Sequence, residues 1–238
     1  MSWGDNAPNH LVGIDIMSRY LSLMLVVFLL LTALACNAVT NAIAGVTIPG
    51  PVISASLATA KNGQTAVFAG GCFWGVEAVF EHVKGVTEVT CGYSGGAAKT
   101  ANYEAVSEGD TGHAEAVRIT YDSSQISYEQ FLRIFFSVAH DPTELNRQGP
   151  DTGTQYRSAI FYTDENQKRI AQTYIAQLDQ AKVFRRPIVT QVVALDSYYK
   201  AEAYHQDYLV NHPNEPYIRI HDQPKVANLR KQFSESYK

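Results

Sequence analysis

One short stretch, residues 65–83, constrains the fold and the chemistry of this chain more than any other (TAVFAGGCFWGVEAVFEHV). It opens with an apolar run at residues 66–69, which is typical of a buried strand. Gly70 and Gly71 then allow a sharp reversal, because glycine adopts backbone angles that other residues avoid. A helical pattern follows, with one apolar side made of Val76, Val79, Phe80 and Val83. The stretch predicts a strand, a tight corner and a helix, with Cys72 at the corner.

The position of Cys72 favours a reactive thiol. Unpaired N–H groups and the helix dipole at a helix N-terminus stabilise a thiolate. The competing interpretation is that Cys72 only fills space, since cysteine is among the most buried residue types. The paired glycines and the two large aromatic residues directly after the sulfur, Phe73 and Trp74, favour the catalytic interpretation.

Composition and charge argue against several classes of protein. The chain has 238 residues, 46% hydrophobic and 18% charged, as ordinary globular proteins do. The net charge is −4 without a basic cluster, so nucleic-acid binding has no electrostatic support. The three cysteines, Cys36, Cys72 and Cys91, form no CxxC pair. This spacing argues against a disulfide framework and against a zinc site.

The N-terminal segment differs in kind from the rest and predicts export. From Met17, one arginine precedes the apolar run 21–31 and then small residues, which is the pattern of a secretory signal. The run is short for a membrane span. Cleavage after residues 33–35 or 42–44, lipoprotein processing at Cys36 and an uncleaved anchor are the alternatives. We expect a periplasmic, membrane-anchored or secreted protein, with Met17 as a candidate start.

We therefore expect three parts. Residues 1–36 form an extension with the signal or anchor. Residues 37–64, rich in Ala, Thr, Ser, Asn and Gly, form a linker. Residues 65–238 form the folded catalytic domain.

A second informative segment is the strand expected at residues 112–121. Its alternation places Glu115 on the same side as Val117, Ile119 and Tyr121. A carboxyl group on an apolar face is desolvated, which raises its pKa and lets it hold a proton near neutral pH. The alternative is a glutamate at a strand end that bends into water.

The other elements follow from periodicity and caps. We expect a strand at 86–91, ended by the glycine-rich residues 92–96, and a helix opened by a capping box at Ser127 and ending near His140. A long polar loop, 147–156, precedes a strand at 158–162.

The C-terminal part continues the same interleaving. We expect a helix from Asp164 to about Lys182, a strand at 188–195, a short helix at 201–209 and a polar tail from His212, draped over the domain as coil. The order of elements predicts an α+β fold of two layers, with helices packed on a mixed or antiparallel sheet.

Three functions are compatible with these residues. The first is a redox thiol enzyme, in which Cys72 attacks a polarised oxidised atom and Glu115 supplies a proton. The second is a cysteine hydrolase, in which His113, His140 or His205 deprotonates the thiol. The third is a non-catalytic peptide-binding domain with an apolar pocket at Phe73 and Trp74. Spacing in the sequence does not separate the first two.

Five motifs resemble, in order, those of the A-type peptide-methionine sulfoxide reductases. They are residues 71–75 (GCFWG), 92–96 (GYSGG), 109–117 (GDTGHAEAV), 140–142 (HDP) and 153–158 (GTQYRS). The resemblance covers about residues 65–222. It implies a ferredoxin-like core and reduction of the S-epimer of methionine sulfoxide, in proteins and as the free amino acid. It implies no metal and no organic cofactor.

The resemblance also implies roles for individual residues. Cys72 is the nucleophile that becomes a sulfenic acid, and Glu115 protonates the sulfoxide oxygen. Tyr103 and Tyr156 donate hydrogen bonds to that oxygen, and Asp151 helps hold the polar network. The substrate's S-methyl group lies between Phe73 and Trp74.

The sequence departs from many family members at its C-terminus, where residues 217–225 contain no recycling cysteine. Cys91 is the one other cysteine of the folded domain, and its strand position points it toward the apolar face. We therefore expect a one-cysteine cycle in a monomer, in which a thioredoxin-like or glutaredoxin-like reductant attacks oxidised Cys72 directly.

Overall fold

The computed structural model of the chain describes residues 1, 48–52, 57 and 63–238. The predicted signal segment, Cys36 and the candidate cleavage sites lie outside the described residues. Within the described residues, no helix has both the length and the apolarity needed to cross a membrane. The chain divides into two units, residues 1–44 and 45–238, and the described strands and helices all belong to the second.

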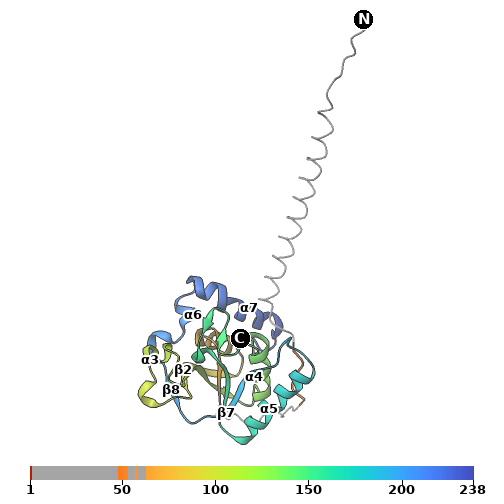
Figure 1. Cartoon of the computed structure of the whole chain (residues 1–238). Coiled ribbons are helices and arrows are strands. Elements are labelled where there is room, and N and C mark those ends of the chain that lie inside the picture. The colour runs from red at the N-terminus through yellow and green to blue at the C-terminus, as the bar shows by residue number, and fades with distance from the viewer. Residues whose placement is uncertain (2–47, 53–56, 58–62) are drawn as a thin grey trace. The chain divides into compact units, whose positions relative to one another are not determined.

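A six-stranded mixed sheet forms the centre of this second unit, in the order β7-β6-β1-β3-β2-β8 (Figure 1). The central strands are β1 (Gly63–Gly70), β3 (Ala114–Asp122) and β2 (Val86–Ser94), and they pair antiparallel. β6 (Ser158–Tyr162) pairs antiparallel with β1 and parallel with β7 (Gln191–Ala194), and β8 (Tyr198–Lys200) lies antiparallel beside β2. The predicted α+β class with a mixed sheet is confirmed; the more specific ferredoxin-like arrangement stays a prediction.

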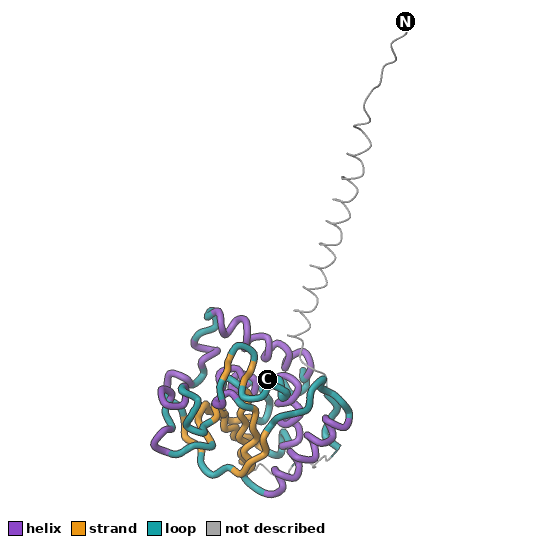
Figure 2. The backbone as a smooth tube through the Cα atoms, viewed as in Figure 1, coloured by secondary structure: helices purple, strands orange, loops and turns teal. Residues whose placement is uncertain are grey.

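Helices surround the sheet (Figure 2). α2 spans Phe73–Glu81, α4 spans Tyr128–Ile134 and continues as a π-helical turn, η2 (Phe135–Ala139), and α5 spans Glu165–Gln180. The capping box predicted at Ser127 is confirmed, since its side chain accepts the Gln130 N–H and the Gln130 side chain accepts the Ser127 N–H. Asp164 caps α5 through the Gln167 N–H, as its position predicts.

The two faces of the sheet carry side chains of different size. Phe68 of β1 joins Val117 and Ile119 of β3 in the main core, which α2, α4 and α5 cover. On the other face, a second cluster consists mostly of alanines. Its members are Val67, Ala69, Ala114, Ala116, Ala159 and Phe161. Glu115 has the parity of Val117, so it lies on the face that the helices cover.

Two local expectations are wrong. Residues 92–94 continue β2 instead of breaking it, because β3 pairs with them on one side and β8 on the other. Gly92 is needed there for close approach, since a Cβ atom would lie 2.4 Å from the Tyr199 carbonyl oxygen. The loop at 147–156 contains a small hairpin, β4 (Arg147–Gln148) with β5 (Asp151–Thr152), and a 3-10 turn, η3 (Thr154–Tyr156).

The C-terminal coil is also a wrong expectation. The segment expected as one short helix forms a 3-10 turn, η4 (Ala203–His205), and the helix α6 (Tyr208–Asn211). The tail forms a π-helical turn, η5 (Ile218–Asp222), and the helix α7 (Gln223–Gln232). Ile218 and Leu229 are fully buried although most of their neighbours are polar, so the tail has an apolar side too sparse to register as a period.

Candidate active site

The site is built around the corner between β1 and α2. Gly71 has φ +92°, which a residue with a side chain rarely adopts, and a Cβ atom there would lie 2.5 Å from the Gln148 side chain. Cys72 follows as the N-cap residue of α2 and is 7% exposed. The predicted strand, corner and helix are therefore confirmed, and the sulfur lies at the start of the helix.

The surroundings raise the pKa of the Cys72 thiol well above its ordinary value. Burial is the largest cause, and the negative charges of Glu115 and Asp222 add to it. The backbone of Trp74, by a hydrogen bond, and the positive charge of Lys225 act in the opposite direction. The helix N-terminus favours the thiolate as expected, through the backbone of Trp74, but burial outweighs this effect and the net pKa is raised.

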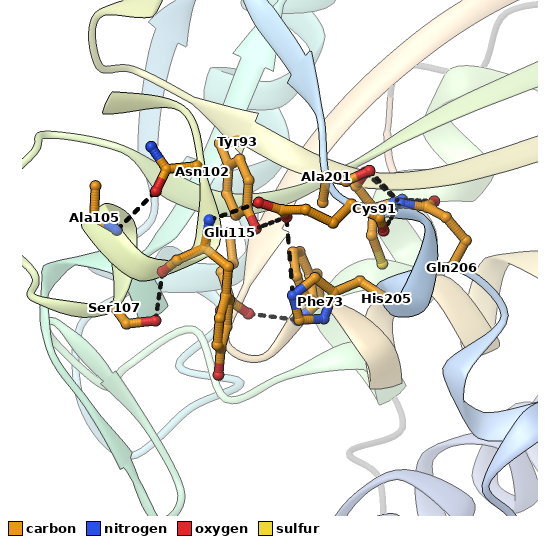
Figure 3. A network of polar contacts seen from close by, with 12 residues as sticks. Phe73, Cys91, Tyr93, Asn102, Ala105, Ser107, Glu115, Ala201, His205 and Gln206 are labelled. Carbon is orange, nitrogen blue, oxygen red and sulfur yellow. Dashed lines mark hydrogen bonds and ion pairs between the residues drawn. The ribbon is translucent and has the colours of Figure 1, made fainter. Parts of the chain in front are cut away.

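Glu115 lies directly beside this thiol. Its Oε2 accepts a hydrogen bond from the N–H of Phe73 at 3.1 Å, so this bond holds the carboxyl group at the first turn of α2 (Figure 3). The side chain is 3% exposed, and burial raises its pKa to about 8 despite that hydrogen bond. The position predicted from strand parity is confirmed, and the alternative of a glutamate bent into water is wrong.

Two tyrosines from other elements lie near the Glu115 carboxyl group. Tyr103 opens the short helix α3 (Tyr103–Ser107), and Tyr156 ends η3. Burial raises the pKa of each phenol, and the nearby charge of Glu115 raises it further. Both phenols are therefore protonated at neutral pH, as hydrogen-bond donors must be.

Asp151 approaches this group from the hairpin strand β5. Its Oδ2 accepts a hydrogen bond from the Tyr217 hydroxyl, and its charge raises the pKa of Glu115. The structure thus brings together all the residues that the sequence predicted for the site (Cys72, Phe73, Trp74, Tyr103, Glu115, Asp151 and Tyr156). Their individual roles stay predictions.

The aromatic side of the site extends beyond Phe73 and Trp74. The Tyr208 ring stacks on the Trp74 indole with centroids 3.7 Å apart and planes 5° apart. The Tyr217 ring meets the same indole edge-on, with ring centroids 6.0 Å apart. The indole N–H of Trp74 donates a hydrogen bond to His205. These three residues all come from the C-terminal segment, and none of them was predicted from the sequence to line the substrate pocket.

The C-terminal segment also reaches the first turn of α2. Asp222 is fully buried, its Oδ1 lies 3.1 Å from Lys225 Nζ, and both groups pack against Gly75. A Cβ atom at Gly75 would lie 2.1 Å from the Asp222 oxygen. The glycine after the two aromatics is therefore explained by the tail packed on it.

The residues missed from the C-terminal segment had one weak signal in the sequence. Residues 201–209 combine the polar side chains of Glu202, His205, Gln206 and Asp207 with two tyrosines and a leucine (AEAYHQDYL). Tyr217 and Asp222 had no comparable signal.

None of the three histidines considered for a hydrolase bonds to Cys72 among the hydrogen bonds of the described residues. His113 accepts the Gly96 N–H and contacts the Ala97 carbonyl, and His140 contacts the Phe135 carbonyl and Ser158 Oγ. Burial lowers the pKa of His140 to about 3, so it is neutral. The geometry therefore gives no support to a Cys–His pair.

Cys91 lies in β2 and is fully buried. Its N–H donates to Gln206 Oε1 at 2.9 Å, and burial, followed by the charge of Glu77, raises its pKa. Cys72 and Cys91 are free thiols. Their neighbourhood contains no cluster of three metal-ligating side chains within the described part of the chain.

Comparison with known proteins places the chain in a family. The family model for peptide methionine sulfoxide reductase matches residues 64–237. A peptide methionine sulfoxide reductase MsrA 2 of Mesorhizobium japonicum is 57% identical over 178 residues, which cover 75% of this chain and 91% of that protein.

Solved structures agree. Mxr1 of Saccharomyces cerevisiae in reduced form is similar with a TM-score of 0.59 and 28% identity, covering 68% of this chain and 94% of that one. Methionine sulfoxide reductase A of Corynebacterium diphtheriae is similar with a TM-score of 0.56 and 32% identity, covering 71% and 85%. This chain belongs to the peptide methionine sulfoxide reductase family.

Proposed function

We propose that this chain reduces the S-epimer of methionine sulfoxide, free and in proteins, through a sulfenic acid at Cys72. One observation carries the proposal beyond family membership. The buried carboxyl group of Glu115 is attached to the turn that begins at Cys72, with the Phe73 N–H at 3.1 Å. A thiol and a protonated acid thus lie at the same helix turn, as transfer of a sulfoxide oxygen requires.

The reaction begins with the substrate oxygen beside Glu115. Burial raises the pKa of this carboxyl group to about 8, so at neutral pH it holds the proton that it delivers to the oxygen. Tyr103 and Tyr156 donate hydrogen bonds to the same oxygen. These donors make the substrate sulfur more electrophilic, which is the activation a weak thiol nucleophile needs.

Cys72 then attacks the sulfoxide sulfur. As an S–S bond forms, the thiol proton passes to the Glu115 carboxylate, which becomes protonated again; this S–S bond breaks when the oxygen moves to the Cys72 sulfur. The oxygen passes to Cys72, so the substrate S–O bond breaks and a sulfenic S–O bond forms. The substrate sulfur gains two electrons, the Cys72 sulfur loses them, and methionine leaves.

For recycling we propose the one-cysteine cycle. A dithiol reductant of the thioredoxin or glutaredoxin class attacks the Cys72 sulfenic acid, releases water and forms a mixed disulfide. The second thiol of the reductant resolves that disulfide and returns Cys72 to the thiol. The full burial of Cys91 and its backbone bond to Gln206 support this route over an internal disulfide.

We also propose that the enzyme works outside the cytoplasm and repairs exported proteins. The apolar run at residues 21–31 and the small residues after it support this proposal. Cell fractionation with N-terminal sequencing tests it. A cytosolic protein that retains Met1 or Met17 would contradict export.

The decisive test of the chemistry is a single turnover with separate S- and R-epimers of a methionine sulfoxide peptide, without reductant. We expect one equivalent of methionine from the S-epimer and the loss of one free thiol, mapped to Cys72 by mass spectrometry. Cys72→Ser should release methionine on the order of 10⁴-fold more slowly or not at all, because its nucleophile is gone. Cys91→Ser is the matched control and should turn over normally with reductant. A stoichiometric Cys72–Cys91 disulfide would contradict the one-cysteine cycle.

A further inference from the structure

We propose that His205 is a positioning residue for this reaction: it holds the Trp74 indole by a hydrogen bond and so fixes the wall against which the substrate methyl group packs. The inference rests on the proposed function, together with the position between Phe73 and Trp74 that the family resemblance implies for the S-methyl group of the substrate. It adds a buried histidine of the C-terminal segment to the substrate site.

The hydrogen bond fixes the tautomer of His205. Trp74 Nε1 donates to His205 Nδ1 at 3.2 Å. An indole N–H can only donate, so Nδ1 must be the unprotonated nitrogen and the neutral ring carries its proton on Nε2. His205 is 1% exposed, and burial lowers its pKa, in agreement with a neutral ring.

The imidazole lies beside the Phe73 ring (Figure 3) and close to two further aromatic rings. Its centroid is 5.0 Å from that of Phe73, 5.8 Å from that of Trp74 and 4.5 Å from that of Tyr103. Three rings that the proposed reaction uses therefore contact one side chain. Movement of this side chain would change both the methyl pocket and the oxygen-binding tyrosine.

Glu202, near the Nε2 side of the imidazole, links two tyrosines by hydrogen bonds. Glu202 Oε1 accepts the Tyr103 N–H at 2.9 Å, and Oε2 accepts the Tyr93 hydroxyl at 2.8 Å. His205 Nε2 lies 4.0 Å from Glu202 Oε2, which is too long for a hydrogen bond. Glu202 thus holds Tyr103 through the backbone N–H of the tyrosine, while His205 holds Trp74 through the indole N–H.

The unpaired Nε2 separates a functional role from simple packing. This buried nitrogen has no hydrogen-bond partner among the described residues. A buried donor without a partner costs free energy, and a phenylalanine of similar shape would avoid the cost. The acceptor at Nδ1 is therefore what the histidine contributes and a phenylalanine would lack.

The test uses the full chain in a Trp3→Phe background, in which Trp74 is the remaining tryptophan. Its indole N–H gives one side-chain signal in a ¹H–¹⁵N spectrum. In His205→Phe the ring volume stays and the acceptor is lost, so we expect this signal to shift and to exchange faster with water. KM for the sulfoxide should rise about tenfold with kcat changed by less than about threefold, because a pocket wall binds substrate and transition state alike.

Two further variants complete the design. His205→Asn offers an oxygen near the Nδ1 position, and we expect it to recover most of the affinity and the wild-type indole signal. His82→Phe at the opposite end of α2, where His82 contacts the Ala78 carbonyl, is the control and should change neither.

Specific outcomes overturn the inference. One is a His205→Phe protein with wild-type KM and an unmoved indole signal. Another is a folded His205→Phe protein whose KM rises while the indole signal stays in place, which would mean packing without positioning. A wild-type protein that releases no methionine would instead reject the proposed function.

Discussion

Two regions of the chain contribute to the site by different means. The first, residues 65–122, supplies Cys72 and Glu115 from regular elements, the start of α2 and the strand β3. The second, residues 201–232, supplies His205, Tyr208 and Asp222 from short turns and helix ends. The first region holds the reacting groups on a helix and a strand, whereas the second packs around them. We expect variants of the first to change the chemical step and variants of the second to change binding or stability.

The largest effect should come from the first region, at Glu115. Glu115→Gln keeps a hydrogen-bonding side chain but cannot deliver a proton, and loss of a general acid typically slows a reaction about 10²–10⁴-fold. In the wild type, kcat/KM should fall as pH rises above about 8, because the carboxyl group then loses its proton. Steady-state kinetics across pH 6–10 measures both. A kcat/KM of Glu115→Gln within a few-fold of the wild-type value would contradict a role of the first region in the chemical step.

Stability supplies an independent check on the same residue. The folded pKa of Glu115 is raised to about 8 from an ordinary 4.5. Its contribution to folding is thus fully present below pH 4.5 and is lost as pH rises through 8. Glu115→Gln has no such loss, so its stability should fall less than that of the wild type between pH 5 and pH 9. Denaturant unfolding at the two pH values measures this difference.

An intermediate effect is expected where the two regions meet, at Gly75. Gly75→Ala improves helix propensity by about 1 kcal/mol. The new Cβ atom would lie 2.1 Å from buried Asp222 and 2.6 Å from Lys225, and overpacking of this kind costs about 1–3 kcal/mol. We expect a net loss in the free energy of unfolding. Gly63→Ala, where a Cβ atom meets nothing within 4 Å, is the control. Equal stability of the two variants would show that the tail is not fixed on α2.

The smallest effect should come from the second region, at Tyr208. Its ring stacks on Trp74 at 3.7 Å, and an aromatic pair contributes about 0.5–1.5 kcal/mol beyond burial. Tyr208→Leu should therefore raise KM about two- to tenfold with little change in kcat. Tyr208→Phe keeps the ring and should behave as wild type. A drop in kcat alone would assign Tyr208 to the chemical step and remove the distinction between the regions.

The sequence by itself determined where Cys72 and Glu115 lie in the first region. A strand, a glycine corner and an amphipathic helix are local patterns, so they place Cys72 without knowledge of the rest of the chain. Strand parity is equally local, and it put Glu115 on the buried face where the structure has it. The helices capped at Ser127 and Asp164 arise from the same kind of short-range signal.

Only the tertiary structure decided the rest. Whether Cys72 is a thiol or a thiolate depends on burial and on the charges of Glu115 and Asp222, which oppose the effect of the helix N-terminus. Gly92 belongs to a strand because β3 and β8 both pair with it, and β8 comes more than 100 residues later in the chain. The C-terminal segment is polar for most of its length and folds onto α2 through a few buried residues, such as Ile218, Asp222 and Leu229. Contacts of this kind join segments far apart in sequence, so no local pattern records them.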